Sequence, residues 1–189
     1  MVALGTEIES PQTGERLTFL STADSSDGEL FRAELVMQPG DYVVRSHVHA
    51  KQEESFVVLE GRWGWKRGRE TGVAEAGETV AIPPGVPHHQ WNAGDVPVRV
   101  HQEHRPALPA AEVFFETYYG LSRDGKLTRK GDPNVLQAAV LLPEVGDFIR
   151  PSSPPLFMQD ALFAALAAIA RRRGYRARYP EYALPSAGD

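Results

Sequence analysis

Short runs of apolar residues, separated by glycine and proline, make up most of the chain as far as about residue 110. These runs carry β-branched or aromatic residues between the breakers, as strands do. Their even spacing favours antiparallel hairpins over an alternation of strand and helix. The pattern predicts a mainly β fold, a sandwich or barrel, with strands within residues 30–40, 41–50, 54–61, 62–68, 78–85 and 96–104.

After residue 110 the apolar positions recur at helical spacing instead. A first helix has Pro109 where the first turn tolerates it, and Gly120 where a helix would stop. A second helix has Asp132 as its expected N-cap and Pro133 at its first position, with Pro143 beyond its end. The chain therefore divides into a β-barrel domain, residues 1–109, and a helical extension, residues 110–189.

The longest predicted helix covers residues 156–174, with arginines in its last turn. The stretch before it, RPSSPPL at residues 150–156, is predicted to be a linker. Apolar stripes on the helices must be buried somewhere. We expect the extension to pack on the outside of the barrel or across a dimer interface. The alternative is that one of its segments closes the mouth of the barrel and shapes a pocket. Positions assigned to these stripes include Val113, Phe114, Tyr118, Leu136, Val140, Met158, Leu162, Leu166 and Ile169.

The composition excludes several classes of protein. The formal net charge of -5 and the pI near 5.7 give no basic field for nucleic acid, and the RRRGYRAR run belongs to a helix end. Cysteine is absent, so neither a disulfide nor a thiolate metal site can form. The first ten residues do not resemble a signal peptide, and the longest apolar run, residues 161–170, is too short to cross a bilayer. We expect a cytoplasmic protein that binds neither nucleic acid nor membrane.

Four of the six histidines fall within two short stretches, SHVHAKQEE and PPGVPHHQWN. His47 and His49 are two residues apart in an extended segment, so their side chains point to the same face. A hairpin through AKQE would turn Glu54 back towards them, and His88 would come from a distant strand. Three neutral imidazoles and one carboxylate suit one divalent first-row metal per chain, such as Fe, Mn, Ni, Cu or Zn. The histidines of an isolated H-x-H are more often structural than metal ligands. The spacing to Glu54 and the residues around it therefore decides between the two interpretations.

That spacing resembles the first conserved motif of the cupin family. The motif consists of a glycine, five residues, H-x-H, three or four residues, a glutamate, six residues and a glycine. His47, His49, Glu54 and Gly61 match it, whereas Gly40 lies six residues before His47 instead of five. Because this glycine belongs to a turn, the difference concerns the turn and leaves the predicted ligands unchanged.

The second cupin motif is matched throughout, by Gly77, Pro83, Gly85, His88 and Asn92. Pro84 and Gly85 also suit the second and third positions of a tight turn. The resemblance covers about residues 20–106 and implies a jelly-roll barrel that holds a metal through His47, His49, Glu54 and His88. Barrels similar to this one commonly form homodimers through sheet edges, so we expect a homodimer.

Side chains on the predicted inner faces of the strands are candidates to contact a substrate. Arg45, Gln90 and His101 share the parity of inward positions, and Phe56 follows Glu54 on its face. For each of these, packing or solvent exposure is an equally good explanation. The partner they would contact is a small organic molecule.

Three functions are compatible with a four-ligand cupin site. Ligands of this kind leave open positions on an octahedral metal, and the resemblance implies dioxygenases that act on small organic acids, phenols and flavonols. The same resemblance also includes decarboxylases, isomerases and proteins that only bind small molecules. We favour a dioxygenase, and keep a non-oxidative isomerase, lyase or decarboxylase and a non-catalytic binding protein as alternatives.

Overall fold

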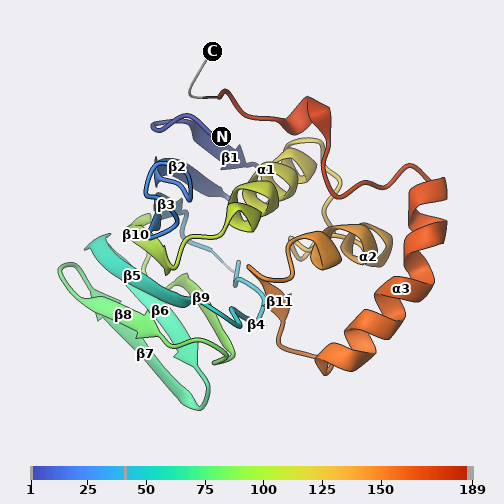
Figure 1. The fold of residues 1–189 in the computed structure, drawn as a ribbon. Helices are drawn as coiled ribbons and strands as arrows, with labels where there is room; N and C mark the ends of the chain where they lie inside the picture. Colours follow the sequence, from blue (N-terminus) through green and yellow to red (C-terminus); the bar gives the residue numbers. More distant parts are fainter. Residues whose placement is uncertain (1, 41, 187–189) are drawn as a thin grey trace.

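Two antiparallel β-sheets form the barrel of the structure, a computed structural model that describes residues 2–40 and 42–186 (Figure 1). The six-stranded sheet has the order β1-β2-β3-β10-β5-β8, with bounds Glu7–Ser10, Glu15–Ser21, Phe31–Met37, Val98–Arg105, Glu53–Glu60 and Thr79–Ile82. The five-stranded sheet has the order β11-β4-β9-β6-β7, with bounds Arg150–Pro151, His47–Val48, His88–Asn92, Arg62–Arg67 and Glu70–Glu75.

The predicted mainly β fold is confirmed, and alternation of the side chains explains it. In β3 the residues Phe31, Ala33 and Leu35 are buried, while their neighbours Arg32 and Glu34 are partly exposed. The two sheets meet through such inward side chains. The rings of Phe56 in β5 and Trp63 in β6, for example, lie 4.7 Å apart between centroids. Strands β1, β2 and β7 lie outside the predicted runs.

A glycine makes the sharp connection from β5 to β6 possible. Gly61 has φ +78°, and a Cβ atom at this position would lie 2.9 Å from the carbonyl oxygen of Pro97. The predicted turn at Pro84–Gly85 is also present. Gly85 has φ +76°, and the Val86 N–H donates to the Pro83 carbonyl at 3.3 Å.

Helix α1 (Pro109–Arg123) continues past Gly120, so the predicted end at this glycine is wrong. The ring of Tyr182 packs directly against Gly120, and any side chain there would collide with it. A close approach of two segments, and not the end of a helix, is therefore the reason for glycine at this position.

Helix α2 (Val135–Glu144) also begins and ends differently from the prediction. Its N-cap is Asn134, whose side chain accepts hydrogen bonds of 3.1 Å from the backbone N–H groups of Leu136 and Gln137. Asp132 binds Arg45 instead, and Pro143 lies inside the last turn. The difference at Asp132 depends on its partner Arg45, which local sequence does not reveal.

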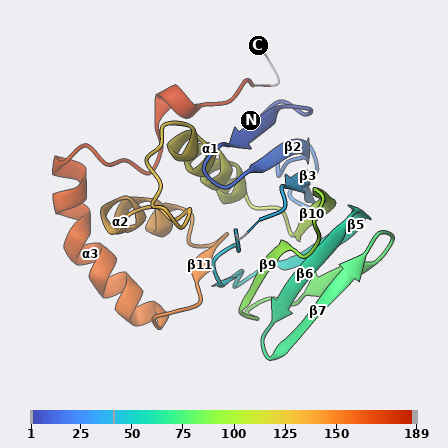
Figure 2. The same cartoon turned by 180° about the vertical axis from the view of Figure 1, so that it is seen from behind.

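Helix α3 (Leu156–Arg172) is present as predicted, and the one-turn 3₁₀ helix η1 (Pro180–Tyr182) follows it. Helix α2 lies between α3 and the rest of the molecule in both views (Figures 1 and 2). The apolar stripe of α3 is not buried within one chain, because Met158, Leu162 and Ile169 stay 45–49% exposed. In the part of the chain that the structure describes, no helix is long and apolar enough to cross a membrane.

The extension closes one end of the barrel. The ring of Phe115 in α1 stacks on Phe31 of β3, with centroids 5.4 Å apart. In the predicted linker, Arg150 and Pro151 form β11, which pairs with β4 beside His47. Side chains of α1 and of residues 148–153 line a cavity together with His47 and His49, as the alternative in which a segment of the extension shapes a pocket expects.

Candidate metal centre

Four buried side chains from three strands and one loop converge at a single point inside the barrel. One donor atom each of His47, His49, Glu54 and His88 lies within 4.8 Å of all the others. His47 in β4 and His88 in β9 are direct partners in the strand register. The segment that carries His49 is held to the Pro84–Gly85 turn, because the Gly85 N–H donates to the His49 carbonyl at 2.8 Å. The structure thus brings together all four predicted ligands.

Each of the three imidazoles is oriented by a hydrogen bond from Nδ1 to a backbone carbonyl. His47 Nδ1 bonds to the Arg45 carbonyl at 2.7 Å, and His88 Nδ1 to the Val86 carbonyl at 2.8 Å. His49 Nδ1 bonds to the carbonyl of Phe148, a residue of the helical extension. In the neutral form with Nδ1 as the donor, Nε2 of each ring carries a free lone pair and points towards Glu54. This is the tautomer that metal ligands require.

The imidazole nitrogens and the Glu54 oxygen that face one another have too few hydrogen-bond donors among them. Glu54 Oε2 lies 2.7, 3.6 and 4.0 Å from the Nε2 atoms of His88, His49 and His47. His49 Nε2, His88 Nε2 and Glu54 Oε2 are buried and make no well-directed hydrogen bond within residues 2–40 and 42–186. Buried acceptors that face one another are costly. A divalent cation among them would satisfy all of them, so the residues fit a metal.

Burial and mutual contact also set the protonation states of the four groups. Burial, followed by the neighbouring imidazoles, lowers the pKa of His47 to about 3. Burial also lowers the pKa of His49 to about 3. Burial alone would raise the pKa of Glu54, but His49, His104 and His88 together hold it well below its usual value. Burial opposes the charged form of His88 too, and its contact with Glu54 outweighs this and raises its pKa. The site thus has an ionised carboxylate and at least two neutral imidazoles.

Two further side chains, which the sequence analysis missed, lie beside the other oxygen of Glu54. Gln102 Nε2 donates to Glu54 Oε1 at 2.7 Å, and His104 Nε2 lies 3.5 Å from the same oxygen. Neither ring nitrogen of His104 has a hydrogen-bond partner among the described residues. The signal was available in β10, where Val98 and Val100 set an inward parity that continues to residues 102 and 104.

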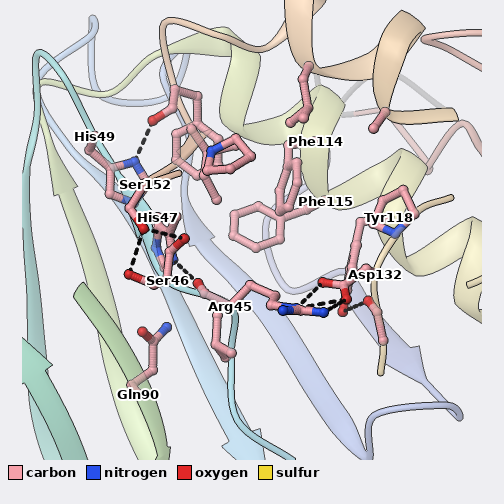
Figure 3. A pocket seen from close by; sticks show the side chains of 18 of the residues that line it. Arg45, Ser46, His47, His49, Gln90, Phe114, Phe115, Tyr118, Asp132 and Ser152 are labelled. Atoms are coloured by element: carbon pink, nitrogen blue, oxygen red, sulfur yellow. Dashed lines mark hydrogen bonds and ion pairs between the residues drawn. The ribbon is translucent and has the colours of Figure 1, made fainter. Parts of the chain in front are cut away.

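The metal centre opens into a cavity of about 480 Å³ (Figure 3). Of the predicted substrate-pocket residues, Arg45 and Gln90 line this cavity, whereas Phe56 and His101 do not. Phe56 is fully buried in the core against Trp63. His101 has the opposite parity to the one expected, and it lies on the outer face of β10 with Nε2 3.9 Å from Glu34.

The helical extension supplies much of the cavity wall, which the sequence analysis did not foresee residue by residue. Figure 3 shows Phe114, Phe115 and Tyr118 of α1 to the right of His47 and His49. Ser152 fixes the segment after α2 to the barrel, since its Oγ atom lies 2.8 Å from Ser46 Oγ and donates to the Ser46 carbonyl at 3.1 Å. The cavity is therefore built jointly by the barrel and the extension.

The fold and the four-residue site define a metal-binding type of double-sheet barrel. Residues 33–102 match the family model of the cupin domain, and this segment contains all four candidate ligands. Residues 33–102 of the chain thus form a cupin domain.

Curated relatives are similar to only part of the chain. A germin-like protein, subfamily T member 2, of Arabidopsis thaliana is 34% identical over 79 residues, which are 39% of this chain and 36% of that protein. An uncharacterized protein of Methanocaldococcus jannaschii is 37% identical over 54 residues, 29% of this chain and 43% of that protein. The chain thus spans less than half the length of these relatives.

Solved structures with a similar barrel include KdgF of Halomonas sp., with 14% identity and a TM-score of 0.47 over 55% of this chain and 90% of that one. A Thermotoga maritima protein described as a predicted oxalate decarboxylase has 17% identity and a TM-score of 0.48, over 57% of this chain and 99% of that one. A sugar phosphate isomerase of Silicibacter pomeroyi has 21% identity and a TM-score of 0.42, over 49% and 59%.

Proposed function

We propose that the protein is a metal-dependent oxidoreductase of the dioxygenase type, which acts on a small organic substrate at a mononuclear site of three histidines and one glutamate. One observation carries this proposal. Nε2 of His49, Nε2 of His88 and Glu54 Oε2 are buried, lack enough donors, and lie beside a cavity of about 480 Å³. A structural metal site would have no need of such a cavity.

The chain itself would hold, orient and enclose the reactants. His47, His49, Glu54 and His88 would hold the metal, and Gln102 would keep Glu54 Oε2 directed towards it. A divalent first-row metal bound in octahedral form by these four residues would supply positions at which a substrate oxygen and dioxygen could be activated. The aromatic residues of α1 would keep bulk water away from the substrate, which favours oxidation without side reactions.

The test combines metal analysis with oxygen consumption. Protein purified from its own host is expected to contain about one equivalent of Fe, Mn, Ni, Cu or Zn per chain. Its own host is used because the metal content of protein made in a foreign host reflects the metal supply there. Reconstituted with this metal, it should consume oxygen with at least one member of a panel of small aromatic and aliphatic compounds. His101→Ala is the matched control, since His101 lies in the same barrel but outside the site.

Two other outcomes would replace the proposal. Conversion of a compound without oxygen uptake would indicate an isomerase, lyase or decarboxylase. Tight binding of a compound without any turnover, at full metal occupancy, would indicate a binding protein. The open coordination positions favour the oxidative reaction, since they suit two reactants at once.

A further inference from the structure

The wall of the cavity beyond the metal centre is formed mainly by apolar side chains. Phe114, Phe115 and Tyr119 come from α1, Leu142 from α2, and Phe148 from the segment before β11. An apolar cavity of about 150 Å³ is enough to bind benzene. The cavity of about 480 Å³ thus has room for a ligand with two rings.

Arg45 is the single Lys or Arg side chain among the described residues that line the cavity, and its guanidinium, although 64% of the side chain is exposed, is already paired with Asp132. Its Nε donates to the two carboxylate oxygens of Asp132 at 2.9 and 2.8 Å, and its second guanidinium nitrogen, Nη2, lies 2.7 Å from Oδ2 (Figure 3). The carboxylate of Asp132 makes no other hydrogen bond in residues 2–40 and 42–186 beyond these contacts. An anionic ligand would have to displace Asp132 before it could pair with Arg45.

A second carboxyl group in the cavity wall also opposes anions. Glu15 of β2 is buried and accepts a hydrogen bond of 2.8 Å from Thr13 Oγ1. Burial raises the pKa of Glu15 to about 7. When Glu15 is ionised it repels an anion, and when it is protonated it offers no positive charge. In either state, the cavity wall itself offers a ligand carboxylate or phosphate no unpaired cationic side chain.

We propose that this cavity selects an uncharged, mainly apolar ligand with one or two rings and an oxygen function directed at the metal centre, and that it discriminates against carboxylates and phosphorylated sugars. The Arg45–Asp132 pair acts as the charge filter. This inference rests on the proposed function only in that the same cavity receives the substrate. The charge selection itself depends on the cavity wall and not on the metal.

The test uses two probes of nearly the same shape and different charge, 2-naphthylmethanol and 2-naphthoate. Binding to the full chain is measured by calorimetry at pH 7.5, after removal of metal with a chelator, so that carboxylate coordination to metal plays no part. The neutral probe should bind at least about tenfold more tightly, because the anion loses hydration without gaining a partner. Equal or tighter binding of 2-naphthoate would overturn the proposal, and so would failure of both probes to bind at millimolar concentration.

The variant Asp132→Asn tests the charge filter directly. It frees the guanidinium of Arg45 while leaving the backbone bonds of residue 132 to Thr128 in place. Binding of 2-naphthoate should tighten by about five- to tenfold, with the neutral probe within about twofold of its original affinity. Glu75→Gln is the matched control, since it breaks the exposed pair with Arg62 outside the cavity. An unchanged affinity of Asp132→Asn for 2-naphthoate would contradict the filter.

A third variant tests whether the probe occupies this cavity. Ala138 of α2 is part of the wall, and Ala138→Phe would fill the space, so 2-naphthylmethanol should bind at least about tenfold more weakly. Unchanged affinity in a folded Ala138→Phe variant would place the probe elsewhere. Failure of the proposed function would be seen as absent metal or absent oxygen uptake with the charge preference intact. Failure of this inference would leave the metal content intact.

Discussion

Gln102 Nε2 donates a hydrogen bond of 2.7 Å to Oε1 of Glu54, and both side chains are buried. This bond occupies one oxygen of the carboxylate and leaves Oε2 directed at the three imidazoles. A hydrogen bond to a ligand's second atom fixes the orientation of that ligand and tunes its affinity for metal. Gln102 is therefore a positioning residue of the site, although neither cupin motif includes it.

Removal of this bond should weaken metal binding without abolishing it. We expect Gln102→Leu to lower the affinity for a divalent metal by about 10- to 100-fold, because Glu54 can then rotate away from the imidazoles. Competition with a chelating dye measures the affinity. His101→Gln, at the adjacent position on the outer face of β10, should leave it unchanged. Equal affinities of Gln102→Leu and the unaltered protein would rule out this role.

Loss of a ligand should have a larger effect than loss of its support. His47→Ala and His88→Ala should each reduce the bound metal to well below one equivalent per chain, because each removes an Nε2 donor from the site. Elemental analysis after dialysis gives the content, with His101→Ala as the histidine control. Full metal content in both variants would show that the cluster is not a metal site.

The buried carboxyl of Glu15 should make the stability of the protein depend on pH. Burial raises its pKa from 4.5 to about 7, with Thr13 and Tyr42 as its hydrogen-bond partners and Tyr118 and Tyr119 nearby. The folded state then binds more protons than the unfolded state between these two values. Stability therefore falls as pH rises through this window, by an amount on the order of 3 kcal/mol.

The variant Glu15→Gln removes this titration. It should unfold at the same urea concentration as the original protein near pH 4, and should be more stable by about 1–3 kcal/mol above pH 7. Glu7→Gln, an exposed carboxylate on β1, serves as the control and should not change the pH profile. A constant difference between Glu15→Gln and the unaltered protein from pH 4 to pH 8 would contradict the prediction.

We expect the chain to form a homodimer and propose that the exposed face of α3 takes part in it. Leu156, Phe157, Met158, Leu162 and Ile169 are 45–74% exposed along this helix. Burial of each such side chain stabilises an interface by about 1.5–3 kcal/mol. Phe157→Lys combined with Leu162→Lys should shift the mass in light scattering from dimer to monomer, and Val96→Lys, at an isolated exposed position, should not. A monomeric mass of the unaltered protein at micromolar concentration would contradict the homodimer.

The barrel should not tolerate removal of the extension. Truncation after Arg105 would uncover Phe19 and Phe31, which contact Phe115 with ring centroids 6.4 and 5.4 Å apart. It would also remove the Phe148 carbonyl that orients His49. We expect residues 1–105 to aggregate and to bind an apolar fluorescent dye. A soluble fragment that is as heat-stable as the full chain would show that the barrel folds independently.

The sequence by itself determined strands β3, β4, β5, β6, β8 and β10 of the barrel and the four candidate ligands. Alternation along a strand decides which face each side chain occupies. The number of residues between the ligands of a motif depends on the length of the turn between them, which is also set by local sequence. His47 and His49 share a face for this reason alone, and Pro84–Gly85 forms its turn because of its own backbone preferences.

Tertiary structure decided what lies around those ligands. The positions of Gly120, Asp132 and Phe148 depend on Tyr182, Arg45 and His49, and each of these partners is more than 60 residues away in the chain. Local preferences carry no information on such long-range contacts. The cavity wall could therefore be identified only after the extension had been placed against the barrel.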